Sequence, residues 1–567
     1  MTNNPDANDP RSESISDQAS RSTLALNPLV GLRRQDLVDS TMILLNAIAR
    51  EPAVAVNQLL EFLGEMGNVV AGKSERKPEA GDKRFADKTW KDSAVHRGLL
   101  QSYLAWGDSL NKFIDQTSLS DINKTRAHLV ASMFIDAAAP TNNLLSNPAA
   151  VRQFFDTGGQ SLWRGINNFV DDLGKNGGLP SQVDKSPFKV GENLATTPGA
   201  VVFQNEILEL IQYVPTTPNV RKRPLVITPP QINKFYSLDL TPEKSLLQFL
   251  LKSGIQVFCV SWRNPTAEHR DWGLDTYLLA LDEAVDATTE ITGSEDISMM
   301  GACSGGITSS AYLGMLAGKG QPKVRNIVLA VCVLDVAAPT DSQFMSLVTP
   351  ETMEAAKASS HVRGVLDGGE LARVFAWMRP NDLIWNYWVN NYLFGNSPPA
   401  FDILFWNGDT TCLPARLHHD YVDLYHTNPF VNAGRLTLNG AAIDMKRVHA
   451  DSYVVAGVTD HITPWKAVYQ TAKIYGDDTT FVLSNSGHLQ AILNPPTNLK
   501  SSFVSGLAKA PDADGFLAGA EKKNGSWWPH WLDWLTARSG DEIPAPAALG
   551  SARHPAGAPA PGTYVFD

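Results

Sequence analysis

Residues 296–306 have the sequence Asp296-Ile-Ser-Met-Met-Gly301-Ala-Cys303-Ser-Gly305-Gly306. A short apolar run here ends in Gly-x-Cys-x-Gly and continues into a segment that is compatible with a helix. This pattern predicts a sharp turn between a strand and a helix, which lifts one side chain above the sheet and needs small residues on either side. Cys303 occupies the lifted position. The sequence therefore predicts a thiol nucleophile at the edge of an α/β sheet.

The sulfur atom indicates the type of chemistry. A cysteine nucleophile holds an acyl group as a thioester, which stays activated for transfer, whereas a serine would hold it as an oxygen ester. A lone cysteine is often only a small core residue, and this is the simplest interpretation of Cys259 and Cys332 in their apolar strands. The glycines around Cys303 favour a nucleophile. We therefore expect acyl transfer rather than hydrolysis.

Strand and helix patterns alternate on both sides of this turn. Their order predicts a mostly parallel sheet with helices on both faces, which is the α/β-hydrolase fold. Four tryptophans at helical spacing in a final helix are expected to be core residues. We expect strands at 201–203 and 208–213, as an antiparallel pair, then at 224–228, 256–262, 297–301, 326–334, 451–455 and 480–483, helices at 275–292 and 306–316, and the core tryptophans Trp527, Trp528, Trp531 and Trp534.

The pattern divides the chain into segments. Residues 1–25 are polar, contain no apolar signal-peptide core and are expected to form a disordered leader. Residues 26–190 have helical spacing and are expected to form an N-terminal support or dimerisation domain. Residues 191–543 are the expected catalytic domain, interrupted at about 337–444 by an aromatic insertion that is too long for an ordinary loop and predicts a cap. Residues 544–567, rich in Pro, Ala and Gly, are expected to be a flexible tail.

Composition excludes several classes of protein. The 567 residues carry a net charge of −11, which argues against a general nucleic-acid binder because such proteins need a basic face. The four cysteines lack paired spacing and fit a reducing compartment, so we expect a cytoplasmic protein. The longest apolar run, 327–334, is far below the roughly 20 residues of a membrane-spanning helix.

A thiol nucleophile needs a base and a group that orients the base. Asp460 follows the strand at 451–455, and His488 follows the strand at 480–483. Both should lie at the same sheet edge as Cys303, and the chain order nucleophile, acid, histidine is that of an α/β-hydrolase. We therefore predict a Cys303, Asp460, His488 triad. His461 is a possible supporting residue, although as a neighbour of Asp460 it is equally explained by the shape of the loop.

An oxyanion hole needs two backbone N–H donors. Ser304, directly after the nucleophile, should supply one. The other should come from the loop Pro229-Pro230-Gln231-Ile232, whose prolines have no N–H group, so the donor is Gln231 or Ile232. We favour Ile232.

The sequence His418-His419-Asp420 superficially resembles a metal cluster. No further ligand spacing supports a metal site there. We interpret these residues as a polar surface turn and predict no bound metal.

Several motifs together resemble those of polyhydroxyalkanoate synthases, over about residues 27–540. The segments 26–31 and 208–213 are most similar to the single-subunit class II enzymes of pseudomonads, which implies medium-chain 3-hydroxyacyl-CoA substrates. The motifs are Pro229-Pro-Gln-Ile-Asn-Lys-Phe-Tyr236, Ser261-Trp-Arg-Asn-Pro265, Gly301-Ala-Cys-Ser-Gly-Gly306, Arg379-Pro-Asn-Asp-Leu-Ile-Trp-Asn-Tyr387, Phe405-Trp-Asn-Gly-Asp409, Asp460-His-Ile-Thr-Pro464 and Ser486-Gly-His488.

The resemblance implies a role for each triad residue. Cys303 would carry the growing acyl chain, His488 would deprotonate it, and Asp460 would assist the base or activate the incoming hydroxyl. The CoA thioester would be the substrate, with no further cofactor, and the partners would be the polyester granule and a second copy of the chain. A thioesterase or depolymerase on the same fold, and a granule-surface binding protein, are the alternatives.

Overall fold

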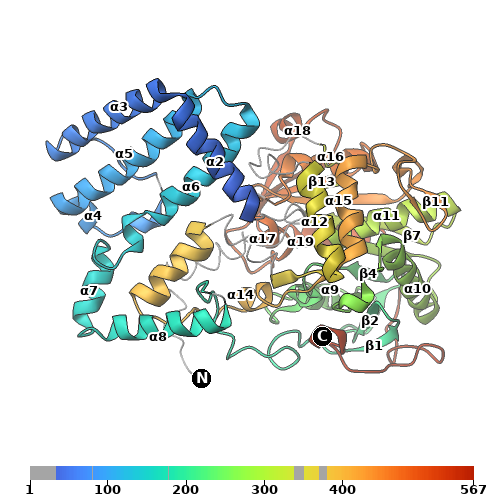
Figure 1. Cartoon of the computed structure of the whole chain (residues 1–567). Helices are drawn as coiled ribbons and strands as arrows, with labels where there is room; N and C mark the ends of the chain where they lie inside the picture. The colour runs from blue at the N-terminus through green and yellow to red at the C-terminus, as the bar shows by residue number, and fades with distance from the viewer. Residues whose placement is uncertain (1–33, 80, 177, 338–349, 370–379, 461) are drawn as a thin grey trace.

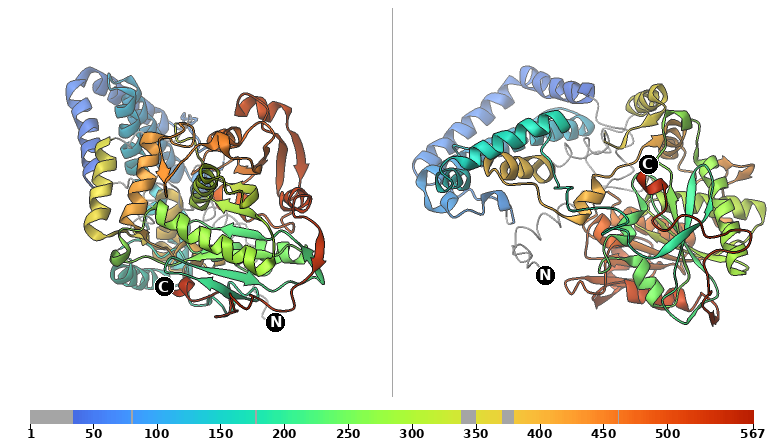
Figure 2. Two further views of the ribbon diagram at one scale, coloured as in Figure 1. Left: turned by 90° about the vertical axis from the view of Figure 1, so that its right-hand side faces the viewer. Right: turned by 90° about the horizontal axis from the view of Figure 1, so that it is seen from below.

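The computed structural model describes residues 34–567 except 80, 177, 338–349, 370–379 and 461. The predicted leader, 1–25, lies outside these residues. The described chain has a helical part, α2 to α8, beside a part built on a large sheet (Figure 1), and Figure 2 shows the same two parts from two further directions. No helix among the described residues is both long enough and apolar enough to cross a lipid bilayer.

A ten-stranded sheet forms the centre of the second part. Its order is β1-β2-β5-β4-β6-β7-β12-β13-β14-β15, and the six strands from β5 to β13 are parallel. The predicted antiparallel pair is confirmed as β1 and β2. The strands are β1 (Gly199–Gln204), β2 (Leu208–Tyr213), β4 (Leu225–Thr228), β5 (Val257–Trp262), β6 (Ile297–Ala302), β7 (Val324–Ala330), β12 (Asp451–Gly457), β13 (Thr480–Ser484), β14 (Ser502–Leu507) and β15 (Glu521–Asn524).

Helices cover both faces of this sheet, because the buried parallel strands are apolar on both sides. One hydrophobic cluster joins the sheet to α10, α11 and α16, and a second joins it to α9, α17 and α19. The α/β-hydrolase arrangement predicted from the sequence is thus confirmed. These helices are α9 (Leu246–Lys252), α10 (Leu274–Thr292), α11 (Ser304–Lys319), α16 (Trp465–Tyr475), α17 (His488–Ile492) and α19 (Trp528–Thr536).

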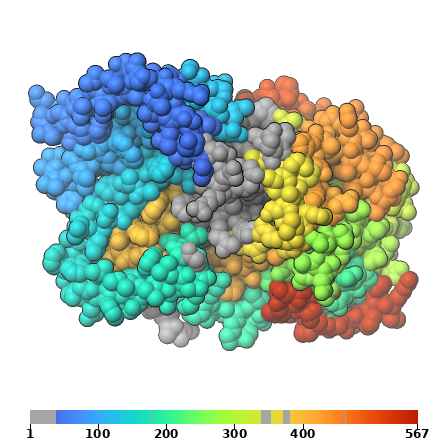
Figure 3. Space-filling model, in the orientation of Figure 1, coloured from blue at the N-terminus to red at the C-terminus, as the bar shows by residue number. Residues whose placement is uncertain are grey.

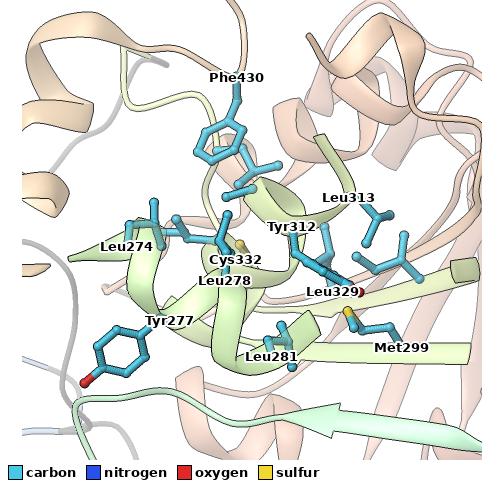
Figure 4. Close-up of a cluster of buried hydrophobic side chains, with 14 of the residues drawn as sticks. Leu274, Tyr277, Leu278, Leu281, Met299, Tyr312, Leu313, Leu329, Cys332 and Phe430 are labelled. Atoms are coloured by element: carbon cyan, nitrogen blue, oxygen red, sulfur yellow. The ribbon is translucent and has the colours of Figure 1, made fainter. Parts of the chain in front are cut away.

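The two clusters contain the residues that the sequence assigned to the core. Cys332 belongs to the first cluster, where Figure 4 shows it among apolar side chains of α10, α11, β6 and β7. Cys259 belongs to the second cluster. Trp527, Trp528 and Trp531 are fully buried beside it and Trp534 is partly buried, so the tryptophan stripe is a packing surface, as predicted.

The described residues from 34 to 175 form helices joined by turns. Pro52 occupies the first turn of α3 and separates it from α2, since proline cannot continue a helix from the preceding turn. The predicted domain boundary near residue 190 lies in the segment between the end of α8 at Lys175 and the start of β1 at Gly199. The boundary itself stays a prediction. The helices are α2 (Arg34–Arg50), α3 (Pro52–Val70), α4 (Thr89–Asp92), α5 (Ala94–Gln116), α6 (Asp121–Ala137), α7 (Pro148–Asp156) and α8 (Gln160–Lys175).

The predicted cap region is described except for 338–349 and 370–379. Its π-helical turns η7 (Asn381–Trp385) and η8 (Trp388–Leu393) lie against α6 and α8 of the helical part, where Figure 1 shows them in gold. The later helix, α15, packs into the first hydrophobic cluster. The other elements are α12 (Pro350–Arg363), β8 (Val365–Leu366), α14 (Asp402–Asn407), β9 (Leu413–Pro414), α15 (Ala415–Thr427), β10 (Thr437–Leu438) and β11 (Ala441–Ala442).

The C-terminal tail differs from the flexible segment that its composition predicted. β16 (Glu542–Pro544) pairs with β3 (Asn219–Arg221), and the chain then runs along the edge strand β1, where the Val201 N–H donates to Ala558 O at 2.8 Å. The last residues bind β2 through Glu209. The prediction of a flexible tail was wrong because a Pro-, Ala- and Gly-rich composition indicates only weak local structural preferences. The open edge of the sheet at β1 and the buried Glu209 carboxylate provide hydrogen-bond partners that hold the tail in place.

Candidate active site

Cys303 lies between β6 and α11 with φ 51° and ψ −122°. A positive φ is strained for a residue with a Cβ, and it turns the thiol out of the strand direction. The neighbouring glycines make the turn possible: a Cβ on Gly301 would approach the Gly306 Cα at 2.7 Å, and one on Gly305 would meet Thr228 O at 2.2 Å. The predicted nucleophile turn, residues 301–306, which we call the elbow, is therefore present, with a Cys303 side chain that is almost completely buried.

The structure brings the other two predicted triad residues together. Asp460 follows β12, and His488 begins α17 after β13, so both come from carboxyl ends of neighbouring parallel strands. His488 Nδ1 lies 2.8 Å from Asp460 Oδ2, and both side chains are buried. The Cys303 side chain hydrogen-bonds to His488. A thiol, an imidazole and a carboxylate thus form a continuous chain.

The Asp460 carboxylate is held by several donors. Its Oδ1 accepts from the Ile462 and Thr463 N–H groups, each at 2.9 Å. Its Oδ2 accepts from the Thr463 hydroxyl at 2.6 Å and from His488. A carboxylate offers about four acceptor positions, so these contacts engage its full capacity.

The electrostatics of the pair favour a proton on His488. Burial alone would lower the pKa of His488, but the Asp460 charge and hydrogen bond, together with Cys303, raise it to about 10. Burial alone would raise the pKa of Asp460, but the charge and hydrogen bond of His488 and the bonds from Thr463 outweigh it, so the pKa lies below its ordinary value. His488 is therefore suited to take the proton of the thiol.

The two predicted oxyanion residues lie at the adjoining strand ends. Ser304 is the first residue of α11, and residues 229–234 follow β4, which pairs with β6. The Gln231 N–H donates to the Ser304 hydroxyl at 3.2 Å, so it is engaged within the protein. That contact favours Ile232 over Gln231 as the second donor, which stays a prediction.

A polar network that the sequence did not reveal braces this loop. Gln231 Nε2 donates to the Thr308 hydroxyl at 2.8 Å, and the Tyr421 hydroxyl donates to Gln231 Oε1 at 3.0 Å. Tyr421 comes from α15, more than a hundred residues from the elbow, and no local signal could have linked them. Thr463 was also missed, although it belongs to the Asp460–Pro464 motif.

The remaining predicted site residues do not join the triad. His461 lies outside the described residues. His418, His419 and Asp420 are not in a surface turn, as the sequence suggested, but in α15, where His418 is fully buried and contacts the Ser360 hydroxyl at 2.7 Å. The apolar spacing of α15 was missed. Among the described residues, no group of three or more His, Cys, Asp or Glu side chains could hold a metal ion.

Comparison with known families gives two matches. Residues 81–250 match the model of the poly-beta-hydroxybutyrate polymerase (PhaC) N-terminus. Residues 224–495 match the model of the alpha/beta hydrolase fold, which agrees with the sheet and the elbow described above.

Curated relatives extend over nearly the whole chain. Poly(3-hydroxyalkanoate) polymerase 1 of Ectopseudomonas oleovorans is 50% identical over 550 residues, which are 97% of this chain and 98% of the relative. Poly(3-hydroxyalkanoate) polymerase 2 of the same organism is 48% identical, and the match covers 95% of this chain and 96% of the relative. The polymerase subunit PhaC of Cupriavidus necator is 38% identical, and the match covers 87% of this chain and 84% of the relative.

Proposed function

The chain belongs to the poly(3-hydroxyalkanoate) polymerase family, and from this we propose that it joins (R)-3-hydroxyacyl-CoA units into a polyester and releases CoA. The observation that carries the proposal is the Cys303 thiol on its strained turn, hydrogen-bonded to the buried His488 and Asp460 pair. This arrangement suits an acyl-thioester intermediate.

The first half of the reaction loads the enzyme. His488 takes the thiol proton, and the Cys303 sulfur attacks the thioester carbonyl of the acyl-CoA. The oxygen of the resulting tetrahedral intermediate accepts from the Ser304 and Ile232 N–H groups. The carbon–sulfur bond to CoA then breaks, CoA leaves with a proton from His488, and an acyl-Cys303 thioester remains.

The second half extends the chain. The 3-hydroxyl of one acyl unit attacks the thioester carbonyl of the growing chain. An ester bond forms, the carbon–sulfur bond of that thioester breaks, and its sulfur leaves with the hydroxyl proton. We propose that His488 is the base in this half too, because the four contacts at Asp460 leave its carboxylate no acceptor position for a hydroxyl. Asp460 then acts through His488, by orienting it and stabilising its charge.

We propose medium-chain acyl groups as the preferred substrates. The motifs at 26–31 and 208–213 resemble those of class II enzymes, and the relatives with 50% and 48% identity are the two polymerases of Ectopseudomonas oleovorans. Comparing kcat/KM for 3-hydroxybutyryl-CoA and 3-hydroxydecanoyl-CoA tests this choice, and a preference for the four-carbon substrate would overturn it.

The activity itself is tested by measuring both products. Purified protein given an (R)-3-hydroxyacyl-CoA should release CoA and form insoluble polyester in matching amounts. Cys303→Ala should lose both products, while Cys412→Ala, at a partly buried thiol outside the triad, should keep both. Release of CoA with only free hydroxy acid would instead identify a thioesterase.

We propose the helical part as the surface that attaches to the polyester granule. Most of the large apolar side chains that are exposed lie within residues 38–173, and Figure 3 shows this part at one end of the molecule. On α8 they form one stripe at helical spacing, Trp163, Ile166, Val170 and Leu173.

Binding to isolated polyester particles tests the attachment. Trp163→Ser with Val170→Ser should weaken binding of the Cys303→Ala protein, whereas Leu507→Ser, at an exposed leucine of β14, should leave it unchanged. Equal binding by both proteins would exclude the α8 stripe. A cytoplasmic location and a homodimer are further proposals, which the resemblance supports and which fractionation and sedimentation would check.

A further inference from the structure

Strand β2 carries a buried carboxylate that the proposed reaction does not use. Glu209 is only 1% exposed. The tail covers it: the Thr563 N–H and the Tyr564 N–H donate to Glu209 Oε2 at 2.9 and 3.0 Å, and the Thr563 hydroxyl donates to Oε1. A buried carboxylate is costly unless it is hydrogen-bonded, so Glu209 binds this part of the tail firmly.

The next residues of the tail bind the loop that follows β4. Lys234 Nζ donates to Val565 O at 2.7 Å and to Asp567 O at 3.3 Å. Tyr564, which lies between Thr563 and Val565 in the chain, is buried, and the Arg263 guanidinium lies over its ring at 4.4 Å. The tail therefore connects the Glu209 carboxylate on β2 to the Lys234 ammonium through three consecutive residues.

Lys234 belongs to the loop that would supply the second oxyanion donor. It is two residues after Ile232, and its own carbonyl accepts from Trp406 Nε1 at 2.7 Å. Its Nζ is also paired with Asp409 at 3.1 Å. The loop is thus held on one side by the Gln231 contacts with Thr308 and Tyr421, and on the other by the tail.

We propose that Glu209 and Lys234 are positioning residues for the oxyanion hole, with tail residues 563–567 as the strap between them. Glu209 cannot act on the substrate directly: its strand is separated from β6 by β5 and β4, which is about 14 Å at the usual strand spacing. It acts by fixing the tail, which fixes Lys234 and, through the loop, the Ile232 N–H. This inference rests on the proposed acyl-Cys303 chemistry.

Two reactions of Cys303 separate this role from a general structural one. Acylation by a 3-hydroxyacyl-CoA develops negative charge on an oxygen and needs the oxyanion hole. Alkylation by iodoacetamide displaces iodide at a saturated carbon and needs only the thiol and its base. In the Cys412→Ala protein, Glu209→Gln should slow single-turnover acylation about 10-fold, because loss of an oxyanion donor outright costs about 100-fold or more. Site-specific alkylation of Cys303 should stay within about two-fold, in line with an intact thiol and base.

Lys234→Met removes the other end of the contact, on the loop, and should likewise slow acylation but not alkylation of Cys303. If Glu209→Gln does not fold, Lys234→Met alone tests the proposal. If both residues act through the tail, the double variant should acylate little more slowly than the slower single variant. Arg553→Ala is the matched control, since the side chain of this tail residue is exposed and pairs with Glu290.

Three outcomes would overturn the proposal: equal loss of acylation and alkylation, no loss of acylation, or fully additive effects in the double variant. Failure of the proposed function is distinguishable, because it would appear as absence of acyl-Cys303 in the protein with native Glu209 and Lys234.

Discussion

The imidazole of His488 and the carboxylate of Asp460 lie 2.8 Å apart with both side chains buried. Asp460→Asn should keep the size of the side chain but lose the charge that holds the imidazolium. We expect acylation and chain extension to fall together, by about 100-fold or more, since general base catalysis is typically worth that much. Single-turnover acylation and polymer yield from a pre-acylated enzyme measure the two halves.

Asp402→Asn provides the control, because this largely buried aspartate pairs with Lys244 outside the triad. Normal acylation with extension alone abolished would contradict our proposal. It would mean that Asp460 activates the incoming hydroxyl directly.

The same pair predicts how stability depends on pH. The folded protein raises the pKa of His488 from 6.5 to about 10, so the contribution of His488 is complete below pH 6.5 and is lost as pH rises towards 10. Asp460 has a lowered pKa, so its contribution is present above pH 3.8 and is lost as pH falls further. The pair should therefore stabilise the protein most between these limits.

Comparing Cys303→Ala with Cys303→Ala/His488→Asn measures this effect without titration of the thiol. The difference in unfolding free energy should be larger at pH 6 than at pH 10. A difference that grows between these two pH values would show that His488 is buried neutral.

The elbow predicts a steric effect at one glycine. Gly305→Ala would place a Cβ 2.2 Å from Thr228 O and 2.6 Å from Pro229 O, both of them backbone atoms that cannot move cheaply. We expect loss of activity and a free energy of unfolding lower by about 2–4 kcal/mol, as for overpacked or strained cores. Denaturant unfolding and CoA release measure the two effects.

Gly67→Ala makes the same chemical change where nothing lies within 4 Å of the new Cβ. It lies inside α3, so alanine should stabilise the helix by up to about 1 kcal/mol. Equal destabilisation by both substitutions would refute the steric explanation.

The sequence was sufficient for the features set by local pattern. The glycines around Cys303 and the apolar runs before Asp460 and His488 identify strand ends, and parallel strands bring those ends to one edge. Features set by distant partners were not predictable in this way. The tail is ordered by Glu209, a polar residue inside a fully buried strand, whose need for a partner does not say where in the chain that partner lies.

The same limit applies to α15. Its segment His418-His419-Asp420 has the composition of a surface turn, yet Leu417 and Tyr421 are buried on one side of the helix. The buried His418 is hydrogen-bonded to Ser360 from α12. Tyr421 then reaches the oxyanion loop. Helical spacing was present in the sequence, but it was obscured by the polar residues between the apolar positions.

The last prediction concerns the contact between the helical part and the cap. Arg84 donates to Asn381 Oδ1 at 2.9 Å, and Asn381 Nδ2 donates to Asp136 Oδ1 at 2.6 Å, so Asn381 links η7 to α6. The cap residues Tyr387 and Trp406 share a buried cluster with Cys303. Loosening this contact should therefore expose the thiol.

Asn381→Leu removes both hydrogen bonds at similar side-chain volume and leaves the Arg84 and Asp136 ion pair in place. We expect a free energy of unfolding lower by about 1–3 kcal/mol, because two charge-assisted hydrogen bonds are lost. Iodoacetamide should alkylate Cys303 faster, and more free hydroxy acid should form per unit of polymer, because water then reaches the acyl thioester. Lys175→Met, at an exposed ion pair on α8, should change none of these. Unchanged alkylation in a destabilised Asn381→Leu protein would show that the helical part supports the cap without controlling access to Cys303.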